Sequence, residues 1–264
     1  MESETGGIES RETEPKNNIV IVDFLRHGTT EYLEYFMPEE EKKKIGDKIP
    51  RDLIPEGEAE VRKTAEQIAQ KIDPKNEIVV LWSSPAWRAQ GSEDIVKEEL
   101  TKRGVEVYRD SEISSMRNFD QYDKQFMNDF WKSLVPTGKS AEIIYSSDPK
   151  FQKKNEKFES QSEVRRRAGR VFNWIRYLAE HADLKGKKLH IIGSSHFEFL
   201  NPIMEDIFMY KVEEGQGIKK GENLSIQFNF NPSNKELSIS ADFRGEHKDG
   251  ITFDKEHRKF VLPK

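Results

Sequence analysis

The sequence predicts an α/β fold in which a mostly parallel sheet is covered by helices on both faces. Short apolar runs rich in β-branched residues alternate with longer segments in which apolar residues recur at helical spacing, and this alternation is typical of parallel sheets. The first run, at residues 19–25, is apolar except at Asp23, as expected for a strand buried on both faces. Two late runs separated by the turn sequence NPSN at residues 231–234 predict a β-hairpin at one edge of the sheet.

Turn residues set the expected limits of the individual elements. Strands of the parallel part are expected at residues 19–25, 78–82, 105–108 and 188–193. Helices are expected at residues 56–72, about 85–102, 161–181 and 198–209. Pro55 fits the first turn of the first helix, Asp73-Pro74 ends that helix, and Gly104 caps the second helix. The hairpin arms are expected at residues 224–229 and 237–241.

The chain is expected to form one domain over residues 18–264, because glycines and prolines mark turns and no internal repeat is present. Residues 1–17 contain five Glu, two Gly and one Pro, which is typical of a disordered acidic tail. Residues 111–158 carry no signal of a parallel strand and are expected to be an irregular, partly helical insertion. Within it, PTGKS at residues 136–140 resembles part of a P-loop without its first glycine, so we interpret it as a turn into a helix.

Composition excludes several classes of function. The 264 residues carry a net charge of −5 with a pI near 5.8, whereas nucleic-acid-binding proteins usually present a basic surface. No apolar run approaches the length of a membrane-spanning helix. The absence of cysteine rules out disulfides, cysteine nucleophiles and thiolate metal sites. The first seventeen residues lack the basic start and apolar stretch of a secretory signal, so a cytoplasmic location is expected.

Chemically active side chains stand where the predicted strands end. Arg26 and His27 follow the first strand, and Arg88 lies one turn into the helix after the second strand. Glu112 follows the third strand and His196 follows the fourth. Because the carboxyl ends of parallel strands meet at one edge of a sheet, two arginines, two histidines and one carboxylic acid are expected to converge there.

This set of side chains fits phosphoryl transfer through a covalent intermediate. The imidazole of His27 is a competent nucleophile in its neutral form. The two guanidiniums can bind phosphate oxygens, and the second histidine can donate to another oxygen when it is protonated. A protonated Glu112 can give its proton to the leaving oxygen, and Gly28 lets the backbone approach the phosphate. The chemistry requires no cofactor and no metal, and the sequence shows no clustered carboxylates that would hold a metal.

Residues 24–31, FLRHGTTE, resemble the Arg-His-Gly-x-Thr signature of the histidine phosphatase superfamily, which includes the cofactor-dependent phosphoglycerate mutases. The similarity continues in order through most of the chain. The matching positions are Pro55-Glu56-Gly57, SSPAWRA at residues 83–89, Glu112, Glu159-Ser160 with Val164 and Arg167, and Ser195-His196.

The resemblance implies a three-layer α/β/α sandwich and a role for each matched residue. It implies His27 as the phosphorylated nucleophile, Glu112 as the proton donor and His196 as the second catalytic histidine. The residues implied to bind phosphate are Arg26, Gly28, Thr30 and Arg88, with His196 beside them. The substrate implied is a small phosphorylated molecule.

The sequence departs from the superfamily pattern at three places. Tyr32-Leu33 stands where Trp-Asn is frequent, and Phe197 follows the second histidine where glycine is common. The glycine and Trp-Glu-Gly pattern that normally trails the acid is absent after Glu112. The acids that compete with Glu112 for the role of proton donor are Asp110, Asp120 and Asp123.

The leading interpretation is therefore a metal-independent phosphatase that hydrolyses phosphomonoesters through a phosphohistidine. Two alternatives are a phosphoglycerate mutase-like phosphotransferase and a catalytically idle protein that binds phosphorylated ligands. The mutase-like Glu-Arg-His-Tyr-Gly stretch is absent, which favours the phosphatase. A basic cluster that includes Arg165-Arg166-Arg167 is interpreted as a solvated face balanced by Glu156, Glu159 and Glu163, with a second interpretation as a grip for an anionic substrate.

Overall fold

The computed structural model describes residues 17–45, 50–134, 141–212 and 215–263. The expected acidic tail, apart from its last residue, and the PTGKS turn lie outside these residues. No helix in the described ranges has the length and apolar character needed to cross a membrane.

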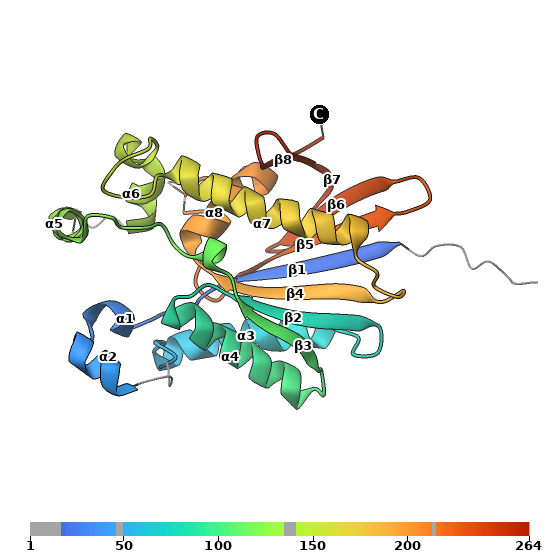
Figure 1. Ribbon diagram of the computed structural model, residues 1–264, viewed down its shortest axis with the longest axis horizontal. Helices are drawn as coiled ribbons and strands as arrows, with labels where there is room; N and C mark the ends of the chain where they lie inside the picture. The colour runs from blue at the N-terminus through green and yellow to red at the C-terminus, as the bar shows by residue number, and fades with distance from the viewer. Residues whose placement is uncertain (1–16, 46–49, 135–140, 213–214, 264) are drawn as a thin grey trace, which may run out of the picture.

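Four parallel strands form one half of a single sheet (Figure 1). In chain order they are β1 (Asn18–Arg26), β2 (Glu77–Ser83), β3 (Val107–Glu112) and β4 (Lys188–Ser195). Across the sheet their order is β3-β2-β4-β1. The third strand lies further along the chain than the predicted residues 105–108, because β3 is the edge strand and its polar sequence YRDSE can face solvent there.

The other half of the sheet is antiparallel and larger than the predicted hairpin. It consists of β5 (Asn223–Asn231), β6 (Glu236–Phe243), β7 (Glu246–Asp254) and β8 (Lys259–Val261), added beyond β1 in that order. The hairpin arms are confirmed as β5 and β6, but β7 and β8 were not predicted. In β7 only Ile251 is buried, so an apolar strand pattern is missing from its sequence.

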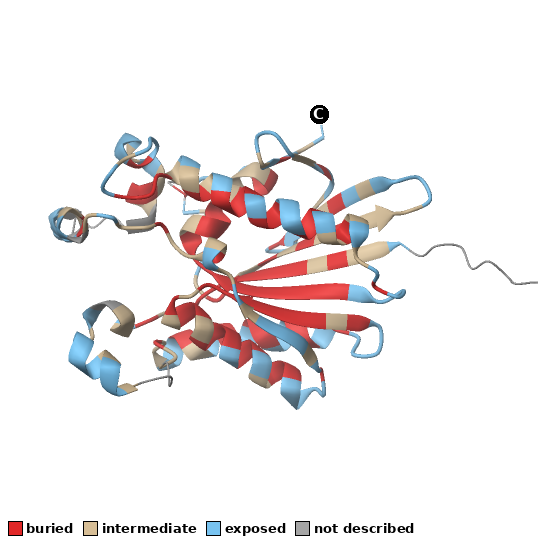
Figure 2. Ribbon diagram, viewed as in Figure 1, coloured by how far each residue is buried: buried red, intermediate tan, exposed pale blue. Residues whose placement is uncertain are grey.

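Helices cover both faces of the sheet, as predicted. One face carries α3 (Pro55–Lys71) and α4 (Trp87–Lys102), and the other carries α7 (Gln161–His181) and α8 (Phe197–Phe208). The central parallel strands are buried between these two layers over most of their length (Figure 2). The fold class is thus confirmed as α/β with helices on both faces.

Each face of β1 belongs to a different hydrophobic core, because successive side chains of a strand point to opposite faces. Val22 and Phe24 pack in the core beneath α7 and α8. Leu25 packs in the core beneath α3 and α4, with Val61 and Ile68 of α3. The same alternation on β2 and β4 fixes the strand register, so the carboxyl ends of β1, β2 and β4 meet at one edge.

Two segments flank that edge of the sheet (Figure 1). Between β1 and α3 lie α1 (Leu33–Phe36) and α2 (Glu39–Ile45). The predicted insertion contains η1 (Ser114–Met116), α5 (Lys124–Leu134), α6 (Ala141–Ser147) and η3 (Pro149–Phe151). Its aromatic residues, which include Phe119, Phe151 and Phe158, form a third small core, to which α7 contributes Val164. The insertion is therefore partly helical, as predicted.

Candidate active site

His27 occupies the first position beyond β1, where the backbone anchors it to the neighbouring strand. Its N–H donates to the carbonyl of Ser195 at the end of β4 over 3.0 Å, and its side chain is buried. Nδ1 lies 2.8 Å from the carbonyl oxygen of Gly28. Because a carbonyl only accepts, Nδ1 carries the proton and Nε2 keeps the lone pair. The Nε–H of Arg88 points at that lone pair over 3.3 Å.

The loop after His27 rests directly on the start of α3 through two glycines. A Cβ atom on Gly28 would lie 2.3 Å from the carbonyl oxygen of Gly57, and one on Gly57 would lie 2.0 Å from that of Thr29. Neither position has room for a side chain. Glu60 of α3 also accepts hydrogen bonds from the backbone and hydroxyl of Thr29. These contacts hold the loop that follows His27 in one position.

His196 lies beside His27 at the end of β4, with a distance of 5.1 Å between the ring centroids. Its Nε2 shares a 2.7 Å hydrogen bond with the hydroxyl of Ser84, which follows β2. Its Nδ1 is buried without a hydrogen-bond partner in the described structure. A buried polar atom of this kind marks a place where a ligand atom can bind.

The two arginines approach the histidines from different elements. Arg26 ends β1 and donates to the carbonyl of Ile218 over 2.7 Å, and Arg88 comes from the first turn of α4. Two of the three departures from the superfamily pattern, Phe197 and Tyr32, lie against these arginines. The guanidinium of Arg26 lies 5.1 Å from the ring centroid of Phe197, and that of Arg88 lies 5.6 Å from the ring centroid of Tyr32. Both aromatic rings thus form cation–π contacts in the pocket.

Burial and the neighbouring cations lower the pKa of both histidines. Desolvation lowers the pKa of His27 well below 6.5, and Arg88 and Arg26 lower it further. The pKa of His196 is lowered by the same burial, by Arg88 and by His27. Both rings are therefore neutral near pH 7. A phosphate dianion between them would favour their charged forms.

The predicted proton donor, Glu112, lies at the surface. It ends β3, is exposed, and accepts a 3.0 Å hydrogen bond from Gln90 of α4. Among the described residues it makes no hydrogen bond or ion pair with either histidine. Thr30 is buried beside the pocket, where its hydroxyl accepts from the backbone N–H of Tyr32.

The three other candidate proton donors, Asp110, Asp120 and Asp123, each interact with a residue other than the two histidines. Asp110 pairs with Lys97 at 2.8 Å, and Asp120 accepts from Arg117 at 2.7 Å. Asp123 accepts from the backbone N–H of Phe126 at the start of α5. Within the described ranges, no three His, Asp or Glu side chains are grouped in a way that could hold a metal ion.

The structure brings in a carboxyl that the sequence analysis missed. Glu34 of α1 accepts from the backbone N–H of Trp87 over 3.2 Å and from Nη1 of Arg88 over 3.4 Å. Burial raises the pKa of Glu34 more than the adjacent Arg88 lowers it. No sequence signal marks this residue, because it reaches Arg88 only through the fold of the segment between β1 and α3.

An α/β sandwich with two histidines and two arginines gathered at the carboxyl ends of its parallel strands is the arrangement of phosphoglycerate mutase-like proteins. The family model of the histidine phosphatase superfamily (branch 1) matches residues 22–238. The chain therefore belongs to the histidine phosphatase superfamily, and the resemblance noted in the sequence is confirmed.

The solved structures to which this chain is similar have low sequence identity to it. The structure titled mycobacterial hydrolase 1 is 13% identical with a TM-score of 0.50, over 88% of this chain and 99% of that chain. A mycobacterial glucosyl-3-phosphoglycerate phosphatase is 13% identical with a TM-score of 0.47, over 87% and 98% of the two chains. The phosphoglycerate mutase of Plasmodium falciparum is 10% identical with a TM-score of 0.41, over 90% and 99%. A search of curated proteins finds no matching sequence.

Proposed function

We propose that the protein is a phosphatase that hydrolyses phosphomonoesters without a metal ion, through a phosphohistidine formed on His27. The observation that carries this proposal is the state of the His27 ring. Its Nδ1 proton is held by the Gly28 carbonyl, which leaves the Nε2 lone pair directed at the guanidinium of Arg88. A phosphate bound by that guanidinium would present its phosphorus to Nε2.

The reaction proceeds in two displacements. In the first, Nε2 of His27 forms a bond to phosphorus while the bond from phosphorus to the ester oxygen breaks, and an acid protonates the departing oxygen. In the second, water attacks phosphorus, the nitrogen–phosphorus bond breaks, and the conjugate base of the acid takes the proton of the water. Arg26 and Arg88 stabilise the charge on the phosphoryl oxygens in both transition states.

Two carboxyls compete for the role of proton donor. Glu112 holds the position implied by the superfamily resemblance, but its carboxylate faces solvent and binds Gln90. Glu34 touches Arg88 and has a raised pKa. A phosphate dianion on Arg88 would raise the pKa of Glu34 further, because like charges disfavour its ionised form. Glu34 would then enter the complex as the acid that the first displacement needs.

Hydrolysis of p-nitrophenyl phosphate in the presence of EDTA tests the activity. We expect turnover in the wild type, no turnover in His27→Ala, and a phosphorylated wild-type protein that survives an alkaline quench and loses its phosphate in acid. Activity that EDTA abolishes and a divalent ion restores would contradict the metal-free mechanism. Assays with 3-phosphoglycerate, with and without the bisphosphate, test the mutase alternative. Phosphate binding without any turnover would indicate the idle binding protein.

A further inference from the structure

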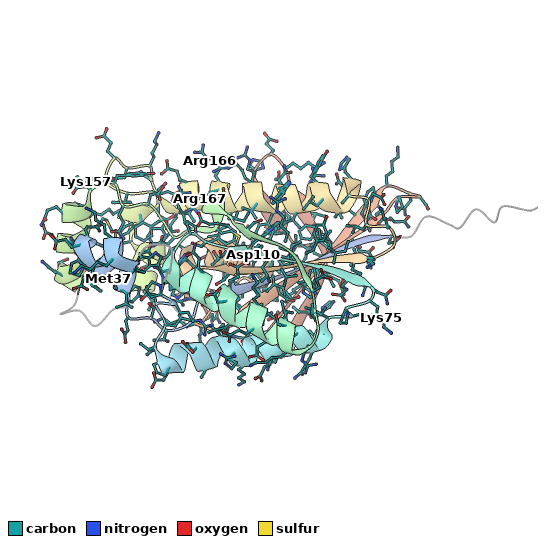
Figure 3. The ribbon with its side chains drawn as sticks, turned by 60° about the horizontal axis from the view of Figure 1, so that its bottom comes forward. Met37, Lys75, Asp110, Lys157, Arg166 and Arg167 are labelled. Carbon is teal, nitrogen blue, oxygen red and sulfur yellow. The ribbon has the colours of Figure 1, made fainter. Side chains whose placement is uncertain are left out.

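The three consecutive arginines of α7 have different environments. Arg167 is buried and pairs with Glu159 at 2.8 Å. Arg165 pairs with Glu205 at 2.8 Å and also with Asp206. Arg166 is exposed and makes no ion pair in the described part of the chain. The interpretation of this cluster as a face balanced by glutamates holds in part, because Arg167 pairs with Glu159 and Arg166 attracts Glu163 electrostatically. Arg167, however, is buried and not solvated. Figure 3 shows Arg166 and Arg167 side by side on α7.

Two further arginines that form no ion pair in the described part of the chain line the same groove as Arg166. Arg170 follows it by one helical turn on the exposed side of α7, and Arg258 comes from the turn between β7 and β8. Within the described ranges neither of them forms an ion pair. Together they line a surface groove of about 630 Å³. The residues that line it are Ser162, Arg165, Arg166, Arg170, Glu256, His257 and Arg258.

Packing fixes Arg258 in this place. The turn that carries it rests on α7 at Gly169, where an added Cβ would lie 2.4 Å from the Cβ of Arg258 and 2.5 Å from its carbonyl oxygen. Arg258 also has a φ of 54°, a left-handed conformation that is uncommon for residues other than glycine. The position of Arg258 at the groove is therefore fixed by the packing of this turn against α7.

The groove holds an excess of positive charge. Burial lowers the pKa of Arg170, and Arg258 and Arg166 lower it further by repulsion. Glu256 is the one carboxylate among the lining residues. Nδ1 of His257 lies 2.7 Å from Oδ2 of Asp254. The charge of Arg165 is balanced by Glu205 and Asp206. Among the lining residues, three guanidiniums therefore face one carboxylate, while Glu163 and Glu159 attract Arg166 and Arg170 from outside the groove. An anion in the groove would relieve the repulsion among the three guanidiniums.

We propose that this groove is a second anion site, which binds a soluble oligophosphate or the oligophosphate part of a larger soluble molecule. Guanidiniums form paired hydrogen bonds to phosphate oxygens, and three of them from two elements match a chain of linked phosphates better than a single one. The groove shares no residue with the pocket around His27. It lies across α7 from the loop that the buried Arg167 holds through the carbonyls of Ser115 and Arg117.

Calorimetric titration with sodium tripolyphosphate tests the site. The protein is His27→Ala, with inorganic phosphate in excess to fill the catalytic pocket. We expect one binding event, and at least a tenfold loss of affinity in Arg166→Gln/Arg170→Gln and in Arg258→Gln, because each substitution removes charge-assisted hydrogen bonds to the phosphate oxygens. Arg103→Gln, which removes one exposed arginine at the end of α4, should bind as tightly as the parent.

Two further measurements complete the test. Thermal melting shows whether each variant is folded, and a variant that melts early is replaced by the corresponding lysine substitution. Vesicles containing phosphatidic acid distinguish a lipid headgroup from a soluble ligand: binding to vesicles that the same arginines control, with no binding of tripolyphosphate, would overturn the soluble assignment. Unchanged tripolyphosphate affinity in the arginine variants, or an equal loss in Arg103→Gln, would overturn the site itself. None of these outcomes depends on phosphatase activity.

Discussion

At the scale of single residues, the pocket depends on two cations that act on one imidazole. Burial, together with Arg88 and Arg26, lowers the pKa of His27 and keeps its ring neutral, and under the proposed mechanism the same two arginines would donate to the phosphate. The positions of His27, Arg26, Arg88 and His196 were predictable, because all four stand at or just beyond the ends of parallel strands that the sheet brings to one edge. Glu34 was not predictable, because its contact with Arg88 joins two segments whose relation is set only by the tertiary fold.

We expect removal of either Arg26 or Arg88 to lower the rate of turnover. We expect Arg88→Ala and Arg26→Ala to lower kcat for p-nitrophenyl phosphate by about 10²- to 10³-fold, the usual effect of removing one donor to a transition state. Steady-state kinetics on purified variants measures this, with Arg103→Gln as the control. A change confined to KM would mean that the arginines bind substrate and transition state equally well.

The proton donor can be identified by comparing leaving groups. An alkoxide needs a proton to depart, whereas p-nitrophenolate leaves readily without one. The variant that removes the donor should therefore slow an alkyl phosphate by about 10²-fold or more while largely sparing p-nitrophenyl phosphate. We expect this selective loss in Glu34→Gln. The alkaline fall of its pH profile should also disappear, because the ionising acid is gone.

Glu112→Gln provides the matched comparison for Glu34→Gln. A selective loss in Glu112→Gln alone would show that Glu112 moves from its surface position to the pocket when substrate binds. Equal losses on both substrates in either variant would indicate a role in shaping the pocket. Glu31→Gln, an exposed residue near the same loop, should leave both activities unchanged.

At the scale of elements, a buried ionic cluster joins three parallel strands. His190 of β4 contacts Asp23 of β1 at 2.7 Å and Glu77 of β2 at 2.8 Å. Despite burial, these two carboxylates raise the pKa of His190 to about 9. Asn223 of β5 donates to the other oxygen of Asp23. Asp23, the one interruption in the apolar run of the first strand, is thus explained by a partner that lies far away in the sequence.

The raised pKa of His190 predicts that stability declines at alkaline pH. A histidine whose pKa is higher in the folded state contributes its full stability below its unfolded pKa of about 6.5 and loses it as the pH rises through about 9. The shift corresponds to about 3 kcal/mol, from roughly 1.4 kcal/mol per pKa unit. Urea unfolding between pH 6 and pH 10 should show this decline. His190→Gln should be less stable at pH 7, and its stability should lack the decline.

Strand prediction failed where packing, and not local sequence, decides. β3 continues over the polar residues RDSE because it lies at the sheet edge, and β7 forms from EHKDGITFD because β6 offers it a partner. The long helix α7 was predicted at its observed limits from the even spacing of its apolar residues, and the structure shows that a capping box of Ser160 and Glu163 fixes its start. Elements with strong local signals were predictable, and edge strands were not.

At the scale of the whole molecule, the insertion has a core separate from the two cores of the sheet. Phe151 is fully buried at its centre, and its ring lies 4.6 Å from that of Phe158 and 5.2 Å from that of Tyr145. The sequence predicted a single domain over residues 18–264, and this remains a prediction. Since the insertion is packed by its own aromatic residues, we expect it to open without unfolding the sheet.

Phe151→Ala tests that independence. Truncation of a buried phenylalanine lowers the free energy of unfolding by about 3–5 kcal/mol. We expect the insertion alone to lose this stability. Hydrogen exchange should become faster in α5, α6 and η3, while amides of β1 and β4 keep wild-type protection. Leu25→Ala, in the core beneath α3 and α4, should instead reduce the protection of the central strands. Equal loss of protection everywhere in Phe151→Ala would mean that the molecule unfolds as one unit.

The contact between Arg88 and the lone pair of His27 has a consequence for the resting protein. While Nε–H of Arg88 is directed at Nε2 of His27, the lone pair of this nitrogen is shielded from electrophiles. An acylating reagent such as diethyl pyrocarbonate should therefore modify exposed His257 much sooner than His27. Arg88→Ala should make His27 more reactive toward the reagent, even though it slows turnover. We expect Nε2 of His27 to become accessible when a ligand such as phosphate binds the guanidinium of Arg88, so the imidazole gains its reactivity together with its ligand.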